Sequence, residues 1–417
     1  MSRTLVAVLL ASLALTAFAA EAPIDAFRER FRSVTPTTFD SGGAVARQFH
    51  LDSASYLEMA TIARTGPARP LPVALRPELA AAPVRWPDGS GSLADYVEND
   101  PYVDGVIVLQ GGRVVFEAYP RMEPWQRHFS WSVSKVVLST ALAALVADER
   151  VDPAANVASY VPALGGTVWD GTSVRDVADM ASGVDCRDSD GYQTPTTCIY
   201  RLEESLGITA PTGYDGGLFA HLRAMERRGP AGERNEYVSA NTIVLGLVLE
   251  AVSGQAFADF ARERLWAPMG AEADGLVAIS PEGFAYTSGG VTLRLRDLAR
   301  FGELHTRPDA FGVLDADFLA DIQGAGVPLD PAGAARREAY FFGDAPVRAS
   351  WQWDQVWEDG ALFKGGYSGQ GLYVDPARDL VVAWFGTGED YSAKRNHMLT
   401  IARQLARSEA LSVASAR

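Results

Sequence analysis

Residues 129–149, FSWSVSKVVLSTALAALVADE, carry the strongest structural signal in the chain. The segment begins with small and polar residues and is almost wholly apolar from Val136 onward. An apolar segment of this length predicts a helix that is buried on most sides. Ser132 and Lys135 are three positions apart in its first turn, so they share one face of the helix. A hydroxyl and an amine would then lie side by side near unsatisfied backbone N–H groups, which suits a serine nucleophile with a lysine base.

Lysine is rare in this chain. Only Lys135, Lys364 and Lys394 are lysines among its 37 basic residues. Arginine keeps its proton in a protein, whereas a desolvated lysine can act as a neutral base near pH 7. A Ser-x-x-Lys motif arises by chance in roughly one such chain in five, so the motif alone is weak and needs support from other segments.

The composition limits the classes of function. With 417 residues, the chain has room for two domains or one large one, and its apolar content is sufficient for a core. The formal net charge is −15, and no basic stripe occurs, which argues against nucleic acid and anionic membrane surfaces as partners. Metal-binding spacings such as HExxH and CxxC are absent from the sequence, so we expect neither a metal nor another cofactor. The sequence does not predict an oligomeric state.

Residues 1–20 have the pattern of a secretory signal peptide, with Arg3 at the positive start and Ala17-Phe18-Ala19 as an A-x-A cleavage site. The apolar part is short for a membrane span, so we expect an exported protein, periplasmic or secreted, without a stable membrane anchor. A transmembrane anchor is the alternative. Cys186 and Cys198 lie twelve positions apart in one predicted loop, and in an exported protein this spacing predicts a disulfide.

The chain divides into four predicted parts. After the signal peptide, residues 21–91 form an N-terminal extension that ends in a proline-rich stretch, where dense prolines disfavour long helices and central strands. Residues 92–125 and 290–408 together form a predicted sheet domain. Residues 126–289 form a mainly helical domain that carries Ser132, Lys135 and Tyr237.

Strand signals occur on both sides of the helical part. Two valine-rich runs around Gly111-Gly112 predict a hairpin, and short strand-like runs from 349 to 385 predict a β-meander. The loop between Asp185 and Thr212 has no clear periodicity. The predicted fold class is α/β, more strictly α+β, with an antiparallel sheet built from both ends of the chain, flanking helices and a mostly helical insert.

Three groups of polar residues stand at the predicted starts of elements: Ser132 with Lys135, Tyr237 with Ser239 and Asn241, and Lys364-Gly365-Gly366. Their order matches the SxxK, Tyr-led and KTG-like motifs, so the chain resembles the serine β-lactamase and penicillin-binding superfamily. The Tyr-led middle motif resembles the class C β-lactamase and class VIII esterase branch. Phrases such as YVSANTIVLGLVLE and GYSGQGLYVDP resemble most the 6-aminohexanoate-dimer (nylon-oligomer) hydrolases. This likeness covers residues 92–408 and implies a β-lactamase/transpeptidase-like fold.

The resemblance implies a role for each matching residue. Ser132 would be the acylated nucleophile, Lys135 its base, and Tyr237 the relay that passes a proton to the leaving group. The backbone N–H groups of Ser132 and Tyr367 would form the oxyanion hole. The implied reaction is hydrolysis of a small amide or ester through an acyl-enzyme, with substrate bound by Ser239, Asn241, Lys364 and Gly366.

Two departures weaken a β-lactamase interpretation. Ser239 stands where β-lactamases carry Asn, and Gly365 replaces the Thr of KTG, which removes a hydroxyl that binds the carboxylate of the substrate. A β-lactamase or D-alanyl-D-alanine carboxypeptidase is therefore the alternative enzyme, and a non-catalytic sensor of cell-wall peptides is the alternative from another class. Structural roles are open too: Tyr237 as a core aromatic, Lys364 as protection of a strand edge, and Ser239 as a helix cap.

Overall fold

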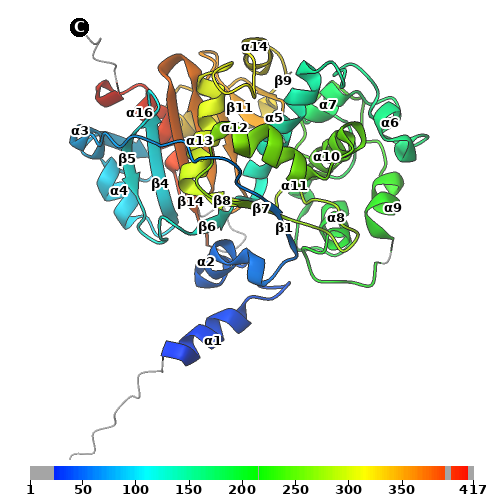
Figure 1. Cartoon of the computed structure of the whole chain (residues 1–417), viewed down its shortest axis with the longest axis horizontal. Helices are drawn as coiled ribbons and strands as arrows, with labels where there is room; N and C mark the ends of the chain where they lie inside the picture. Colours follow the sequence, from blue (N-terminus) through cyan, green and yellow to red (C-terminus); the bar gives the residue numbers. More distant parts are fainter. Residues whose placement is uncertain (1–22, 215, 390–395, 412–417) are drawn as a thin grey trace, which may run out of the picture.

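The computed structural model describes residues 23–214, 216–389 and 396–411. Within these ranges, helices cover both faces of a large antiparallel sheet, and further helices gather around α5 (Ser134–Ala147) beside it (Figure 1). The predicted signal peptide, residues 1–20, lies outside the described residues.

The large sheet joins strands from distant parts of the chain, as predicted. Its eight strands run in the order β5-β4-β14-β13-β12-β11-β10-β9. Val382 of β14 pairs with Val108 of β4, so the C-terminal meander continues directly into the early hairpin. The strands are β4 (Val103–Gln110), β5 (Arg113–Ala118), β9 (Val327–Pro328), β10 (Arg348–Ser350), β11 (Trp353–Val356), β12 (Leu362–Gly365), β13 (Gly371–Asp375) and β14 (Leu380–Gly386).

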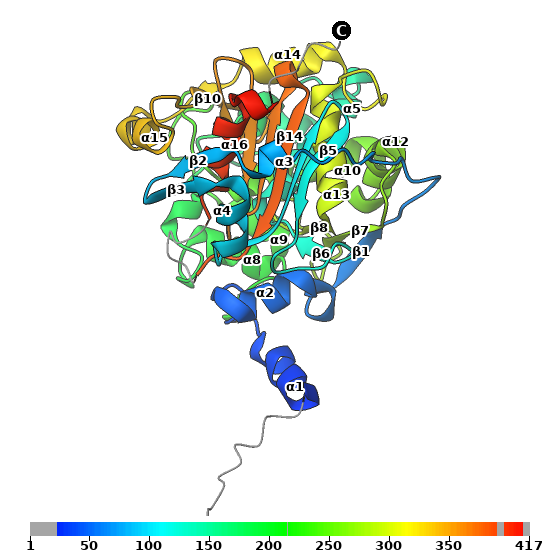
Figure 2. The same ribbon diagram turned by 90° about the vertical axis from the view of Figure 1, so that its left-hand side faces the viewer.

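The two faces of this sheet pack against different helices (Figure 2). α13 (Leu295–Thr306) covers one face and α16 (Met398–Ala406) covers the other. Side chains alternate along a strand, so Ile107 of β4 belongs to the core that includes α13, whereas Val108 belongs to the core that includes α16. The predicted antiparallel sheet with flanking helices is therefore confirmed.

The start of the predicted central helix is different in the structure. Residues 127–129 form strand β6 (Arg127–Phe129), Trp131–Val133 form a 3-10 turn, and α5 begins only at Ser134. Pairing explains the difference, because Phe129 is paired with Thr292 and the backbone N–H of Ser130 donates to the Val291 carbonyl at 2.9 Å. The apolar part is buried as predicted from Ser134 to Leu145.

A smaller sheet, which the sequence did not predict, lies beside the turn that carries Ser132. Its order is β1-β7-β8-β6, with β1 (Met59–Ile62), β7 (Gly275–Ala278) and β8 (Val291–Arg294). Each strand has only three or four residues, which is too short for a period-2 pattern to be recognised. A separate hairpin joins β2 (Pro83–Trp86) and β3 (Gly89–Ser92).

Among the remaining helices, α10 (Ser239–Ser253) begins within the polar group that was predicted to start an element. It packs against α5, as Figure 1 shows, and ends at Gly254 in the left-handed conformation. α8 falls inside the cysteine loop that we expected to be irregular; Thr197 caps it by accepting a hydrogen bond from the Tyr200 N–H. The other helices are α4 (Leu93–Asn99), α6 (Val157–Tyr160), α7 (Val174–Ala178), α8 (Cys198–Ser205), α9 (Gly217–Ala224), α11 (Phe257–Ala261), α12 (Ala267–Met269), α14 (Ala316–Gly324) and α15 (Ala334–Tyr340).

The N-terminal extension contains more helix than its prolines suggested. α1 (Pro23–Ser33) and α2 (Gly43–Leu51) precede the proline-rich stretch, which contains the short α3 (Pro77–Ala80) and the strand β2. α2 packs under β6, while α1 projects away from the body of the molecule (Figures 1 and 2). The extension is thus partly docked beside the strand that leads into the central helix.

No single helix of the described residues is long and apolar enough to cross a membrane. The helical segments Ser239–Ser253 and Phe257–Met269 reach that length and composition together, but they bend by 78° at their junction. α10, the first of the two, is largely buried inside the fold.

Candidate active site

Ser132 lies in the 3-10 turn between β6 and α5, at the mouth of a cleft of about 520 Å³. Its Oγ is 3.2 Å from the Nζ of Lys135. Ser132 lines the cleft, whereas Lys135 is completely buried behind it. The structure therefore brings the predicted hydroxyl and amine together at a surface that a small molecule can reach.

Among the described residues, Lys135 has three hydrogen-bonding partners, and none of them is a carboxylate. Its Nζ lies 3.2 Å from Ser132 Oγ, 2.9 Å from Ser239 Oγ and 2.6 Å from the Ser288 carbonyl oxygen. Burial is the main reason that the pKa of Lys135 falls to about 7, with a further lowering by Lys364 and an opposing effect of Asp188. Part of the Lys135 population is therefore neutral near pH 7.

The partners of Lys135 also fix the direction of its lone pair. Ser239 donates its hydroxyl hydrogen to Asp188 Oδ2 at 2.6 Å, so its Oγ must accept a hydrogen from Lys135. The Ser288 carbonyl can only accept. A neutral amine has two hydrogens, and these two partners use both of them. In this neutral form the lone pair of Lys135 is directed toward Ser132, which can then donate its hydroxyl hydrogen to it, whereas in the charged form Lys135 Nζ donates to Ser132 Oγ.

Tyr237 stands two residues before α10, and its phenol is held by Lys364. Lys364 Nζ donates to the phenol oxygen at 2.8 Å and pairs with Asp354 Oδ1 at 2.5 Å. Lys135 Nζ lies over the same ring, 5.2 Å from its centroid. Burial, with the nearby carboxylates Asp354 and Asp188, raises the pKa of Tyr237 well above its usual value, so the phenol keeps its proton at neutral pH.

Gly366 allows the end of β12 to approach the turn that carries Ser132. A Cβ at this position would lie 2.8 Å from the Ser130 carbonyl oxygen and 2.5 Å from Gln370 Oε1. The next residue, Tyr367, lines the cleft together with Ser132, and its ring is 5.7 Å from that of Trp131. The two residues that were predicted to supply oxyanion N–H groups are therefore on adjacent segments.

The structure distributes the other predicted residues around this cleft. Ser239 lines a small hollow that also includes Ser132, and Lys364 is buried behind Tyr237. Asn241 is not part of either wall, because it is buried in α10 and its amide nitrogen lies against Met180 Sδ at 3.6 Å. Its prediction as a substrate-binding residue therefore lacks support from the geometry.

Two carboxylates that carry no motif also belong to the site. Asp188 accepts from the backbone N–H and the hydroxyl of Ser239, and the Tyr192 hydroxyl donates to it as well. Glu203 lines the small hollow beside Ser132, and burial raises its pKa to about 8. In the sequence, Asp188 is only an acidic residue in a loop of a protein that is expected to be exported, and no motif marks it.

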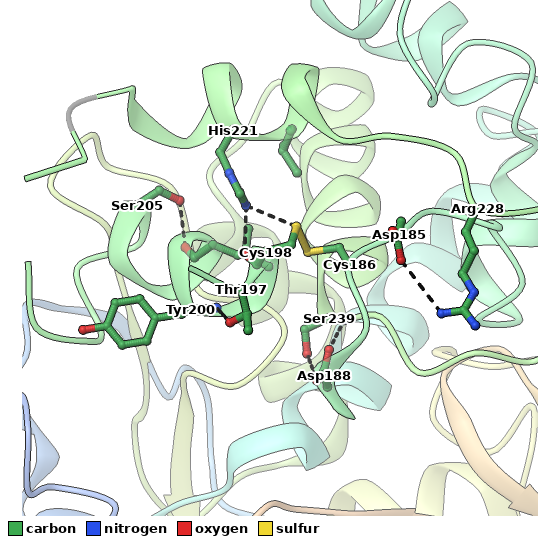
Figure 3. Close-up of a disulfide and its surroundings, with 12 residues drawn as sticks. Asp185, Cys186, Asp188, Thr197, Cys198, Tyr200, Ser205, His221, Arg228 and Ser239 are labelled. Atoms are coloured by element: carbon green, nitrogen blue, oxygen red, sulfur yellow. Dashed lines mark hydrogen bonds and ion pairs between the residues drawn. A yellow bond between two sulfur atoms is a disulfide. The ribbon is translucent and has the colours of Figure 1, made fainter. Parts of the chain in front are cut away.

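The predicted disulfide joins Cys186 and Cys198, as Figure 3 shows. Cys186 is two residues before Asp188, and Cys198 is the first residue of α8. The crosslink therefore lies beside the short segment that presents Asp188 to Ser239 (Figure 3).

The similarity of this chain to known proteins agrees with the geometry of the site. A match to the β-lactamase family covers residues 100–407, a span that includes Ser132, Lys135, Tyr237 and Lys364. The chain belongs to the β-lactamase family. The β-lactamase/transpeptidase-like fold and the family membership that the motifs predicted are confirmed, and the protein is a serine hydrolase of this family.

Two relatives carry the same description. The chain is 30% identical over 353 residues to 6-aminohexanoate-dimer hydrolase of Paenarthrobacter ureafaciens, covering 82% of this chain and 86% of that protein. The structure of a candidate 6-aminohexanoate-dimer hydrolase from Bacillus anthracis has a TM-score of 0.76 at 20% identity, covering 91% of this chain and 97% of that one.

The same fold occurs in an esterase-like enzyme. EstCE1, described as a hydrolase with promiscuous acyltransferase activity, has a TM-score of 0.57 at 16% identity and covers 75% of this chain and 95% of its own. At this identity the likeness shows the fold alone.

Proposed function

We propose that this β-lactamase family member hydrolyses small amides or esters through an acyl-enzyme on Ser132, with Lys135 as the base and Tyr237 as the proton relay. The observation that carries the proposal is the environment of Lys135. Its two amine hydrogens are committed to Ser239 and Ser288, its lone pair faces Ser132, and its pKa is about 7. Such an amine can accept the proton of Ser132 at neutral pH.

The proposed acylation step balances as follows. Ser132 Oγ bonds to the carbonyl carbon of the substrate while its proton moves to Lys135, and the carbonyl oxygen becomes an oxyanion near the backbone N–H groups of Ser132 and Tyr367. When the bond to the leaving amine or alcohol breaks, a proton passes to the leaving group through the phenol of Tyr237. Water then attacks the acyl-enzyme, and the same groups return the proton to Ser132.

The hydrogen bonds of Tyr237 support its part as a relay. Lys364 occupies one lone pair of the phenol oxygen as a donor, which leaves the phenol hydrogen directed elsewhere. The pKa of Tyr237 is raised, mainly by burial, so the phenol has a proton to give. The phenol of Tyr237 can pass this proton to the leaving group while it receives the proton that Lys135 took from Ser132.

Among amides and esters, we propose that the site accepts acyl or leaving groups that carry an amine. Asp40 and Glu203 are among the residues that line the small hollow beside Ser132, which at about 10 Å³ has room for no more than a water molecule. Burial raises the pKa of Glu203 to about 8, so an ammonium group bound in the cleft next to this hollow would favour the ionised form of Glu203. The similarity to 6-aminohexanoate-dimer hydrolase agrees with this chemistry.

A parallel assay of three substrate classes tests the proposal: p-nitrophenyl esters, 6-aminohexanoate dimer and a chromogenic cephalosporin. We expect turnover of an ester or of the dimer, loss of that turnover in Ser132→Ala, and slow or no turnover of the cephalosporin. Turnover of the cephalosporin at an ordinary enzymatic rate would favour the β-lactamase alternative. Complete inertness of the wild type toward all three and toward a serine-reactive fluorophosphonate would favour the non-catalytic sensor.

We also propose that the protein is exported. The pattern of residues 1–20 supports this, and so does the disulfide between Cys186 and Cys198, because structural disulfides persist mainly in oxidising compartments. N-terminal sequencing of protein recovered from the periplasm or medium should show a mature start near residue 20 or 21. An intact Met1 on protein retained in the cytoplasm would contradict export.

A further inference from the structure

The N-terminal extension reaches the active site at several points. Asp40 lines the small hollow beside Ser132 and Phe39 lies against Trp131, while the buried His50 makes a hydrogen bond to Trp131. His50, near the end of α2, is completely buried, and its Nε2 is 2.8 Å from the indole Nε1 of Trp131. Trp131 immediately precedes Ser132. A residue from a segment outside the family match therefore contacts the neighbour of the nucleophile.

The hydrogen bonds of His50 have a single consistent direction. An indole N–H can only donate, so Nε2 of His50 accepts and the proton of a neutral His50 is on Nδ1. Nδ1 then donates to Thr387 Oγ1 at 3.1 Å, and the Thr387 hydroxyl donates to Asp104 Oδ2 at 2.5 Å. Asp104 is held in turn by Arg47 Nε at 2.7 Å. Each hydrogen in this series is therefore assigned: Trp131 donates to His50, His50 donates to Thr387, and Thr387 donates to the buried carboxylate of Asp104.

This buried cluster is not arranged as a metal site. His50, Asp104 and His128 have potential ligand atoms within 4.8 Å of one another. The ring nitrogens of His50 are both used by Trp131 and Thr387, and those of His128 face Asp104 and the Phe129 carbonyl. The lone pairs that a cation would need are therefore engaged in hydrogen bonds, and a positioning role fits the cluster better.

Trp131 has a backbone conformation that requires support. Its φ is +46°, in the left-handed region that non-glycine residues seldom adopt. Its ring lies 4.9 Å from Phe129 and 5.7 Å from Tyr367, so it is wedged between the strand that enters the turn and the other predicted oxyanion residue. The hydrogen bond to His50 is the only one that the indole makes among the described residues.

We propose that His50 is a positioning residue for the oxyanion hole. By holding the indole of Trp131, it keeps the left-handed turn in place, and the turn aims the backbone N–H of Ser132 while the indole supports Tyr367. The inference rests on the proposed acyl-enzyme function, and it gives the N-terminal extension a part in catalysis. Misplacement of such donors by about 1 Å costs roughly 100-fold in rate.

Two substitutions of His50 test this role. His50→Phe keeps a ring but leaves the Trp131 N–H without its acceptor, whereas His50→Gln retains one acceptor and one donor in reach of Trp131 and Thr387. His305→Phe is the matched control, since His305 is another buried histidine, bonded to the Thr140 hydroxyl at 3.2 Å, and it does not line the cleft or the small hollow. The readouts are the melting temperature, kcat and KM for an ester, and the ratio of kcat/KM for that ester to its thionoester, because an oxyanion hole favours oxygen over sulfur.

We expect His50→Phe to lower kcat by about 10- to 100-fold with KM within about twofold, and to reduce the ester/thionoester ratio. His50→Gln should restore both within several-fold, and His305→Phe should lower the melting temperature without changing the ratio. Any of three results would overturn the inference while leaving the proposed function standing. The first is an unchanged kcat and ester/thionoester ratio in His50→Phe, and the second is an equal fall of that ratio in His305→Phe. The third is a folded His50→Gln variant that does not recover kcat and the ratio. Inertness of the wild type toward esters, toward 6-aminohexanoate dimer and toward a serine-reactive fluorophosphonate would overturn both.

Discussion

Individual residues around Lys135 set both its proton affinity and the direction of its lone pair. Asp188 acts on both, because its negative charge raises the pKa of Lys135 and its oxygens fix the hydroxyl of Ser239. The charge of Asp188 thus opposes the lowering that burial imposes, and the pKa of Lys135 settles at about 7.

Asp188→Asn should therefore change the pH profile as well as the rate. Without the negative charge the pKa of Lys135 falls, so the acidic limb of kcat/KM should move to lower pH. The maximal rate should also fall, by about tenfold or more, because an amide at this position can donate to Ser239 and reverse its hydrogen bonds. Asp185→Asn is the control: it lies on the same loop but faces Arg228 at the surface (Figure 3). A profile of Asp188→Asn that coincides with that of the control would contradict this account.

The residues that sequence reasoning found are those that carry a motif. Ser132, Lys135 and Tyr237 were predicted because their spacing and order match a family pattern. Asp354 was not, because it meets Lys364, ten positions along the chain, only through the pairing of β11 with β12. Asp188 was not, because its partner Ser239 is 51 positions away. His50 was missed for the same reason, being 81 positions from Trp131.

Among the elements, the loop from Cys186 to α8 is the one whose shape most directly affects the site. The disulfide closes the segment that presents Asp188 to Ser239 (Figure 3), and Tyr192 of the same segment donates a hydrogen bond to Asp188. Crosslinking a loop of this size stabilises a folded protein by about 3 kcal/mol in the loop-entropy description.

Replacement of both cysteines by serine should therefore lower the free energy of unfolding by about 2–4 kcal/mol. Urea denaturation of the variant and of the wild type, with and without reductant, measures the difference. Reductant should shift the wild type toward the variant and leave the variant unchanged. Equal denaturation midpoints for all four samples would show that the crosslink is energetically silent.

The N-terminal helices make contrasting contributions to the whole molecule. α1 projects from the body with Ile24 and Phe27 about half exposed, whereas α2 buries Phe49 and His50 under β6. Full burial of one large apolar side chain contributes about 1.5–3 kcal/mol. The extension therefore consists of a peripheral helix and a helix that is part of the core.

Two truncations separate these contributions. Removal of residues through Ser33 should change the free energy of unfolding by less than about 1 kcal/mol and preserve activity, because the lost helix is mostly exposed. Removal through Asp52 should cost about 3 kcal/mol or more and abolish activity, since it deletes Phe49 and His50. Circular dichroism melts and ester assays of the two proteins provide the measurement. Full activity of the shorter protein would contradict the role assigned to α2.

At the level of the whole molecule, the large sheet was predictable and the small one was not. The valine-rich hairpin around Gly111 and the C-terminal meander have strong local patterns. The sequence therefore predicted one antiparallel sheet that combines these two parts of the chain. The sheet containing β1, β6, β7 and β8 depends largely on pairing between short segments far apart in the chain, such as Ile62 with Gly275 and Phe129 with Thr292. The late start of α5 follows from the same pairing, because β6 takes residues that otherwise suit a helix.

The central claim, that Lys135 activates Ser132, is tested most directly by the pH dependence of acylation. An activated ester or fluorophosphonate is mixed with the enzyme, and the rate of adduct formation on the Ser132 peptide is followed by mass spectrometry. The account predicts that the rate rises about tenfold per pH unit below pH 7, levels off above it, and falls by at least about 100-fold in a folded Lys135→Arg variant. An adduct on another residue, or a Lys135→Arg variant that reacts at the wild-type rate, would contradict it.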